Sequence, residues 1–354
     1  MRKEEKMKKV HFMEFMEFWR NNIGQRRILL FGMIVCILVF SPQSITLAKG
    51  VFPDGDITFI CNSQPGGGND LIARGFAAYF TQNVKAIVPG AKGGGMKVRN
   101  EAGGAGAKAY TAINEADPDG YTIGDFNAGQ LYDYLTGTLK LPFDLRKMTY
   151  LYAVCSTTRI MVTPKKGFTT WEEMLAASKK EPLRWVIGQY GSAMHLESIY
   201  VKETVGIPGK FIITEGSAKV VSALLRGDAD IVFMAYEAVR SAIESNDVNV
   251  LVTFSNERVL PQVPTIGEKG FPQMVNYVGP YRTVVGPPNL DPEAKRVILA
   301  TARKVMADAG FRDYLKKMGI IDINPIYDKE VYDKTYGYAK FFQDFELIIK
   351  KYIK

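Results

Sequence analysis

The sequence predicts an α/β protein built around mainly parallel β-sheets. After residue 50, short apolar segments typical of strands alternate with segments of helical periodicity. Residues that favour turns separate these segments, and no internal repeat stands out. Strands that alternate with helices are typical of parallel sheets covered by helices. The length of about 300 residues beyond the N-terminal segment favours two domains.

In the first half of this region, apolar runs bounded by turn residues predict the strands, and apolar spacing predicts the helices. Strands are expected over 56–61, 121–126 and 148–164, and helices over 70–80, 108–116, 131–139 and 169–180. The helix over 70–80 carries Ile72, Phe76 and Phe80 on one face. The helix over 169–180 is expected to have Thr170 near its N-cap, with Glu172 and Glu173 in its first turn.

The second half continues the alternation and ends in two long helices. Strands are expected over 183–189, 210–214, 229–235, 249–255 and 281–288, and helices over 192–205, 217–228, 236–245, 291–308 and 330–353. The segment 148–164 is unusually long for one strand. Its part 150–163, together with 277–286, is the best candidate for a pair of crossings between two domains.

The N-terminus has the pattern of a secretory signal. Residues 1–27 are rich in Lys and Arg, 28–40 are apolar without a charge, and Thr46 and Ala48 supply the small residues of a cleavage site. The apolar run of 13 residues is shorter than the roughly 20 that cross a bilayer. We therefore predict a signal peptide over 1–48 and a periplasmic protein. An uncleaved membrane anchor is the alternative.

Composition excludes several classes of function. The formal net charge of +8 falls to +4 without residues 1–48, and basic residues form no stripe with aromatic ones, so a nucleic-acid partner is not expected. His195 is the one histidine beyond the signal, and no cysteines share a ligand spacing, so neither a metal site nor a cofactor is expected. Cys61 and Cys155 either form a disulfide or remain buried thiols.

Small and polar residues mark four predicted joints between a strand and the helix that follows it. These joints are 62–70, 127–130, 189–195 and 214–218. Helix N-termini at the carboxyl ends of parallel strands present unpaired N–H groups to anions. The patterns of phosphate loops and dinucleotide-binding loops do not fit any of the glycine-rich windows. A carboxylate is therefore the expected ligand, although each joint alone is also explained as a turn and a cap.

Two residues at these joints have open roles. Asp70 caps its helix, or it selects ligands that carry an amine or a hydroxyl group. His195 donates to a ligand, or it is only a residue of the first helical turn. No Gly-x-Ser-x-Gly motif is present, and a single histidine disfavours a catalytic triad, so no catalytic residue is expected.

Six segments together resemble the extracytoplasmic receptors of tripartite tricarboxylate transporters, the Bug-type solute-binding proteins. They are PGGGNDLIAR (65–74), VRNEAGGAGAKAY (98–110), ADPDGYTI (116–123), GQYGSAMHL (188–196), TEGSAKVVSALLRGDADIVF (214–233) and ERVLPQVPTIGEKGFP (257–272). The resemblance implies a two-lobed periplasmic binding protein, type II-like, whose two mainly parallel sheets are joined by two crossing strands. It implies lobe I over 49–152 and 280–354, and lobe II over 153–279.

The resemblance also implies a function without enzymatic activity. Such a receptor closes over a small organic carboxylate and presents it to the membrane permease subunits of the transporter. The loop at Gly66, Gly67, Gly68 and Asp70 would hold one carboxylate, and loops of the second lobe would complete the pocket. The expected ligand-binding residues are Ser63, Gly66, Gly67, Gly68, Asp70, Asn127, Gln130, Gly191, Ser192, Ala193, His195, Thr214, Gly216 and Ser217.

The chain also departs from the family pattern. The charges of Arg99 and Glu101 are exchanged relative to those usual in the family at these positions. An insertion is apparent over 86–95, and Glu215 stands where a cation is common. A ligand with one carboxylate and a neutral or cationic far end is therefore as tenable as a di- or tricarboxylate. Two other functions remain as alternatives: an exported α/β enzyme that acts on a small carboxylate, and the ligand-binding input of a sensor kinase.

Overall fold

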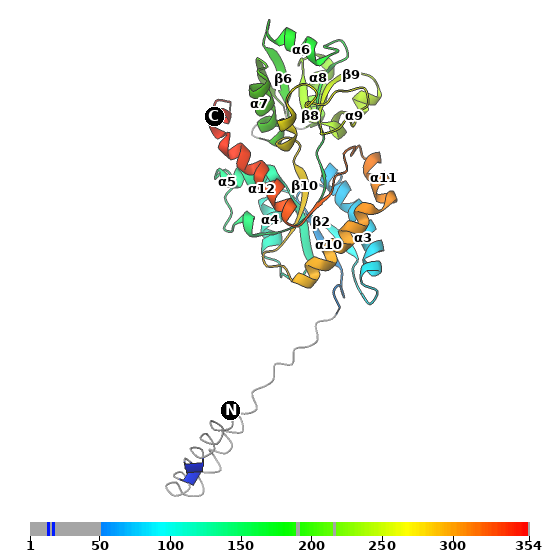
Figure 1. The fold of residues 1–354 in the computed structure, drawn as a ribbon, viewed down its shortest axis with the longest axis vertical. Coiled ribbons are helices and arrows are strands. Elements are labelled where there is room, and N and C mark those ends of the chain that lie inside the picture. The colour runs from blue at the N-terminus through cyan, green and yellow to red at the C-terminus, as the bar shows by residue number, and fades with distance from the viewer. Residues whose placement is uncertain (1–12, 15, 18–50, 189–191, 215–216, 353–354) are drawn as a thin grey trace. The chain divides into compact units, whose positions relative to one another are not determined.

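The computed structural model describes residues 13–14, 16–17, 51–188, 192–214 and 217–352 (Figure 1). Residues 1–49 and 50–354 form separate units, and in the first unit the four described residues are helical. The predicted signal segment and its cleavage site thus lie almost wholly outside the described residues. Within the described ranges, no helix combines the length and the apolar character needed to cross a membrane.

A six-stranded sheet forms the centre of the first lobe. Its order is β11 (Ile326–Tyr327), β4 (Thr149–Ser156), β10 (Tyr281–Gly286), β3 (Thr122–Phe126), β1 (Ile57–Cys61) and β2 (Met96–Asn100). Strand β1 pairs in parallel with β2 and β3, whereas β10 is antiparallel to β3 and β4. The apolar residues of β1 and β4 are almost completely buried because helices cover both faces of the sheet.

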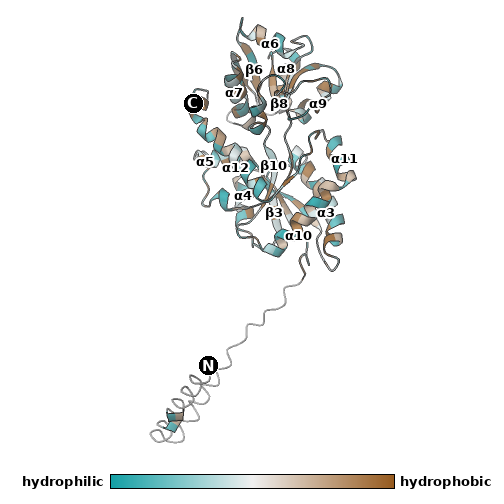
Figure 2. Cartoon of the chain, viewed as in Figure 1, coloured by the Kyte–Doolittle hydropathy of each residue, from teal (hydrophilic) through white to brown (hydrophobic). Residues whose placement is uncertain are grey.

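Two groups of helices cover this sheet. One group comprises α3 (Gly68–Ile87), α10 (Pro292–Ala307) and α11 (Ala309–Lys317), and the other comprises α4 (Ala107–Asn114), α5 (Ala128–Leu135) and α12 (Lys329–Asp344). Helix α10 is amphipathic, and Figure 2 shows both apolar and polar residues along it. Its buried residues, such as Val297, Ile298 and Val305, recur at helical spacing, as the sequence predicts for this segment.

The second lobe contains two short sheets. Strands β8 (Val232–Ala235), β5 (Arg159–Pro164) and β9 (Val248–Phe254) pair antiparallel, and β6 (Leu183–Ile187) pairs in parallel with β7 (Gly209–Ile213). A single bridge from Trp185 to Ile231 connects the two sheets. The helices of this lobe are α6 (Trp171–Ser178), α7 (Ala193–Val205), α8 (Ser217–Arg226) and α9 (Tyr236–Glu244).

The expectation of mainly parallel sheets is wrong, because five of the eight strand pairs in the described residues are antiparallel and three are parallel. The crossings explain the difference. The chain leaves the first sheet through β4 and enters the second lobe as β5, and it returns from β9 to β10. A strand that enters a lobe through the crossing begins at the edge where the other strands end, so it must run in the opposite direction. The single predicted strand 148–164 is in fact β4 and β5, with Thr157 and Thr158 between them.

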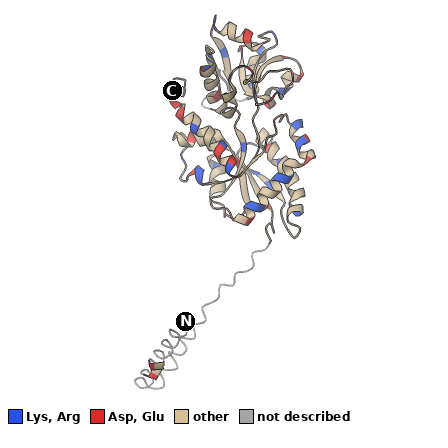
Figure 3. Cartoon of the chain, in the orientation of Figure 1, with Lys and Arg blue, Asp and Glu red and all other residues tan. Residues whose placement is uncertain are grey.

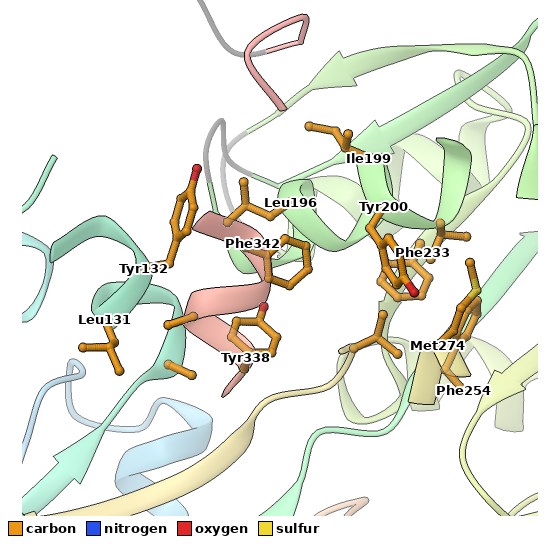
Figure 4. Packing of buried hydrophobic residues seen from close by; sticks show 14 of the residues in the cluster. Leu131, Tyr132, Leu196, Ile199, Tyr200, Phe233, Phe254, Met274, Tyr338 and Phe342 are labelled. Carbon is orange, nitrogen blue, oxygen red and sulfur yellow. The ribbon is translucent and has the colours of Figure 1, made fainter. Parts of the chain in front are cut away.

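The C-terminal helix α12 packs against both lobes (Figure 4). Its Tyr338 and Phe342 lie among Leu131 and Tyr132 of α5 and Leu196 of α7. The predicted final helix 330–353 divides at Phe345, where a second short helix, α13 (Glu346–Ile349), begins. The sequence analysis missed β2, β11 and α11, of which β2 alternates between buried and more exposed residues at the edge of the sheet.

Candidate ligand-binding site

The four predicted joints between strands and helices are present in the fold. They connect β1 to α3, β3 to α5, β6 to α7 and β7 to α8. The first two belong to the first lobe and the last two to the second. Residues 189–191 and 215–216 lie outside the described part of the chain, and so does the side chain of Ser217. The predicted site residues Gly191 and Gly216 therefore fall outside the description.

The glycine-rich joint leads into the N-terminus of α3. Gly66 adopts the left-handed conformation (φ 80°), which only glycine adopts without strain, and Gly67 occupies the N-cap. Gly67 has no side chain to cap the helix, although its carbonyl accepts the first helical hydrogen bond, from Leu71. The N–H groups of the first turn are therefore not blocked by a capping side chain, which suits an approaching anion.

Asp70 is fully engaged within the protein. Its side chain is buried and accepts hydrogen bonds from the Gly66 N–H (2.8 Å), the Arg74 Nε (3.0 Å) and the Asn100 Nδ2 (2.7 Å). Burial alone would raise the pKa of Asp70, but these hydrogen bonds outweigh it and hold the pKa below its ordinary value. Asn100 also donates to the Ser63 carbonyl (3.0 Å), so Asp70 and Asn100 together fix the shape of the loop.

The second joint is tied to the first by side-chain hydrogen bonds. Asn127 caps α5 by accepting from the Gly129 N–H (2.8 Å). The Asn62 amide donates to the Tyr110 hydroxyl (3.1 Å) and to Gln130 Oε1 (3.4 Å), and Tyr110 also bonds to Gln130. Asn127 lines the cavity described below, whereas Gln130 acts in this internal network.

The second lobe contributes Ser192, Ala193, His195 and Thr214. Ser192 caps α7 by accepting from the His195 N–H (3.3 Å). The Thr214 hydroxyl donates to the Ile187 carbonyl (3.1 Å), which ties the ends of β6 and β7 together. The His195 ring is buried and packs edge-on against Phe211, with ring centres 5.0 Å apart. Burial lowers its pKa to about 4, so His195 is neutral at pH 7 and adds no positive charge to the site.

The joints of the two lobes approach each other at Gly129 and Ala193. A Cβ atom placed on Gly129 would lie 3.5 Å from the Ala193 Cβ, an ordinary van der Waals contact. Gly129 belongs to the first turn of α5 and Ala193 is the first residue of α7. The N-termini of two helices, one from each lobe, therefore meet beside the loops that the sequence analysis selected.

A cavity of about 90 Å³ lies on the first-lobe side of these loops. Its polar lining includes Asn69, Asp125, Asn127 and Arg282, together with Thr157 and Thr283. Its apolar wall includes Phe59, Ile72, Phe76, Tyr152 and Val154. The Tyr152 hydroxyl is buried and has no hydrogen-bond partner. The cavity thus combines an apolar wall with a few converging polar groups, as small-molecule sites do.

Among the polar residues of this cavity that were not predicted from the sequence are Asn69, Asp125 and Arg282. Asn69 lies inside the glycine-rich joint, and Asp125 is in β3, two residues before Asn127. Asp125 accepts a hydrogen bond from the Asn62 N–H (2.7 Å), and burial raises its pKa to about 6. Asp125 lies near the carboxyl end of a predicted strand, where ligands bind in α/β sheets, so its position could have indicated a site residue. Arg282 gave no comparable signal, because it lies alone on a predicted crossing strand.

Arg282 is unusual for its position in the fold. Figure 3 shows that charged residues lie mainly on helices and loops, and that the strands are mostly uncharged. Arg282 lies on β10 and bonds through Nη1 to Asn69 Oδ1 and through Nη2 to Glu237 Oε1 of the second lobe. Its Nε atom is buried without a partner.

Neither a metal site nor a disulfide is found in the described part of the chain. No group of three or more His, Cys, Asp or Glu residues there could hold a metal ion. Cys61 and Cys155 are buried free thiols, which decides between the two alternatives left open by the sequence. Burial raises the pKa of Cys61 to about 11 and that of Cys155 to about 12, so both remain protonated at neutral pH.

The two-lobed α/β architecture and its crossings define a periplasmic binding protein of type II-like fold. Residues 92–350 match the family model described as the tripartite tricarboxylate transporter family receptor. The chain therefore belongs to this family of solute-binding receptors, which are not enzymes. The matched residues begin after the glycine-rich joint, so the motif at 65–74 is supported by the fold and not by this match. No curated protein sequence matches the chain.

Solved structures share the fold at low sequence identity. A TctC solute-binding protein from Polaromonas is 20% identical, with a TM-score of 0.71 over 85% of this chain and 99% of its own. The R. palustris protein Rpa4515 with adipate is 18% identical, with a TM-score of 0.62 over 84% and 97%. MatC (Rpa3494) from Rhodopseudomonas palustris with bound malate is 19% identical, with a TM-score of 0.59 over 83% and 97%.

Proposed function

We propose that this receptor captures a small organic carboxylate by closing its two lobes and delivers it to the permease of a tripartite tricarboxylate transporter. The observation that carries the proposal is the meeting of the α5 and α7 N-termini at Gly129 and Ala193. Helix N-termini attract anions, and a ligand that contacts both would stabilise the closed arrangement of the lobes. The adipate and malate in the two R. palustris structures support a carboxylate ligand.

The proposed site consists of the loops that the sequence analysis selected. On the first lobe, Gly68 offers its backbone N–H group and Asn127 offers an amide. Gly66 and Gly67 shape the loop, because their N–H groups are bonded to Asp70 and to the Gln64 carbonyl. Asp70 supports this loop from within. Several hydrogen bonds to one carboxylate, each contributing about 1.5–3 kcal/mol, are sufficient for micromolar affinity.

The proposed role as a receptor that delivers its ligand to a membrane permease from outside requires that the protein be exported. We propose a periplasmic location, which rests on the secretory pattern of residues 1–48 and on the periplasmic-binding-protein fold. The enzyme alternative is wrong, because the chain belongs to a family of receptors. An input role for a sensor kinase would use the same lobes, and nothing in the described residues favours it over transport.

A binding screen tests the proposal. The exported protein, stripped of bound ligand, is titrated with malate, adipate and benzoate while its melting temperature and the heat of binding are followed. We expect at least one acid to bind with one-to-one stoichiometry and to raise the melting temperature. An acid at 100 times its Kd would stabilise the protein by about 2.7 kcal/mol. A folded, ligand-free sample that binds none of the acids would contradict the proposal.

A further inference from the structure

We propose that Arg282 binds the carboxylate of the ligand and that Glu237 occupies this position until the ligand arrives. The inference rests on the proposed function and deepens it, because it names a ligand-binding residue outside every loop selected from the sequence. Arg282 lies on β10, which returns from the second lobe, and Glu237 lies in the first turn of α9 in that lobe. Their ion pair therefore joins the two lobes.

The position of Arg282 places its charge at the open helix terminus. Its Nη1 donates to Asn69 Oδ1, and Asn69 belongs to the first turn of α3, whose N-cap is Gly67. The guanidinium group and the uncapped helix N-terminus thus supply positive potential to the same place. Asp125 is the one carboxylate among the described lining residues, and its raised pKa of about 6 lets it take up a proton more readily than an exposed aspartate. Among the described residues that line the cavity, Arg282 is the only Lys or Arg.

The contacts of Arg282 leave part of its binding capacity unused. A guanidinium group holds a carboxylate best through two parallel N–H donors. Glu237 takes only Nη2 and Asn69 takes Nη1. The buried Nε makes no hydrogen bond to the described residues, and the guanidinium group also lies near the Cys155 thiol, a weak acceptor. A ligand carboxylate that accepts from Nε and Nη2 together would satisfy all three nitrogen atoms, which Glu237 does not do in this arrangement.

A second buried ion pair shows what a purely structural pair looks like in this chain. Glu197 accepts from Arg159 Nε (2.6 Å), the Tyr338 hydroxyl (2.8 Å) and the Gly279 N–H (3.2 Å). Its side chain is completely buried, whereas those of Arg282 and Glu237 are 19% and 20% exposed. The pair between Arg282 and Glu237 is thus more accessible and less completely bonded, as an exchangeable pair should be.

Glu237 can leave Arg282 without becoming an unsupported buried charge. It lies in the first turn of α9, where the helix dipole favours a carboxylate, and it is partly exposed. A ligand carboxylate beside Arg282 would repel Glu237 if both remained. Exchange of one carboxylate for the other removes this repulsion, and it couples ligand binding to the contact between the lobes.

Three variants of the full exported protein test the inference by calorimetric titration with malate, adipate and benzoate. Arg282→Gln removes the cation, and we expect the acid that binds the wild type to bind about 10- to 100-fold more weakly. Glu237→Gln removes the competing charge, and we expect about 5-fold tighter binding. Arg240→Gln is the matched control, because Arg240 also joins the lobes, through the Lys317 carbonyl (2.7 Å), but does not line the cavity. It should bind the acid as the wild type does.

The outcomes separate this inference from the proposed function. Binding of an acid to the wild type and equally to Arg282→Gln would overturn the role of Arg282 and leave the receptor function intact. Weaker binding by Arg282→Gln without tighter binding by Glu237→Gln would overturn the exchange. Failure of the wild type to bind any acid would contradict the proposed function itself. If Arg282→Gln does not fold, Arg282→Lys provides the comparison, since it keeps the charge but loses the two-donor geometry, and binding as tight as in the wild type would contradict the assignment.

Discussion

The Asp70 carboxylate and its three donors, on Gly66, Arg74 and Asn100, fix the glycine-rich loop before α3. Its place in the first turn of a helix was predictable, and Arg74, one helical turn further on, is a partner that spacing alone suggests. Asn100 lies 30 residues away on β2, and no local pattern connects it to the loop. The same limit applies to Arg282, which reaches Asn69 across 213 residues. Contacts of this kind depend on the pairing of strands, so they require the fold.

The hydrogen bonds of Asp70 predict that it matters for stability. We expect Asp70→Asn to lower the free energy of unfolding by about 1–3 kcal/mol. The NH2 group of the new amide would face N–H donors that now bond to the carboxylate, and those hydrogen bonds would be lost. Urea unfolding at pH 7 measures the change. Asp133→Asn is the control, because burial raises the pKa of Asp133 to about 6 and its charge therefore gains nothing from folding. Equal losses in both variants would contradict the assigned role of Asp70.

His195 predicts a dependence of stability on pH. Its pKa is lowered to about 4 in the folded protein, against 6.5 for an unperturbed histidine, so the unfolded chain binds more protons between these values. The contribution of His195 is fully present above pH 6.5 and is lost as the pH falls toward 4. We expect the melting temperature of the wild type to fall further than that of His195→Gln between pH 7 and pH 4.5. Equal decreases in the melting temperatures of the two proteins would show that His195 does not titrate in this way.

At the scale of secondary structure, the joints were predictable and the sheets were not. Glycine clusters and capping residues such as Ser192 and Asn127 are local signals, and they mark where strands give way to helices. The direction of a strand depends on the lobe from which the chain enters it. The apolar composition of the strand does not indicate this direction. The division of 148–164 into β4 and β5 was missed for the same reason, since both strands are buried and apolar.

The meeting of α5 and α7 gives a prediction for ligand capture. Gly129→Leu would place a bulky side chain at the contact with Ala193 and hold the lobes apart. We expect binding of the acid to weaken at least about 10-fold, a loss of about 1.4 kcal/mol, with the fold preserved. Gly337→Leu on α12 is the matched control, because a Cβ there meets no atom within 4 Å. Unchanged affinity in Gly129→Leu would contradict the proposed contact of the ligand with both helices.

At the scale of the whole molecule, Glu197 connects the parts that a hinge must hold. Arg159 begins the outgoing strand β5, Gly279 precedes the returning strand β10, and Tyr338 lies on the C-terminal helix. All three donate to the Glu197 carboxylate, which is completely buried. This network fixes the two crossings relative to α7 and so defines the frame within which the lobes can close.

Loss of this network should therefore affect the molecule as a whole. We expect Glu197→Gln to destabilise the protein by about 3–5 kcal/mol, because the buried guanidinium of Arg159 loses its counter-charge. Asp333→Asn, which breaks the exposed pair with Lys329, should cost less than about 1 kcal/mol. Denaturant unfolding of both variants measures the difference. Similar stabilities of the two variants would mean that Glu197 does not hold the crossings together.

Closure of the lobes over a carboxylate is the central claim, and small-angle X-ray scattering measures it most directly. The ligand-stripped exported protein is compared with and without a saturating concentration of the acid that binds it, with Gly129→Leu measured in parallel. We expect the acid to lower the radius of gyration of the wild type and to change that of Gly129→Leu less. A radius that stays constant while the wild type is saturated with acid would contradict capture by closure.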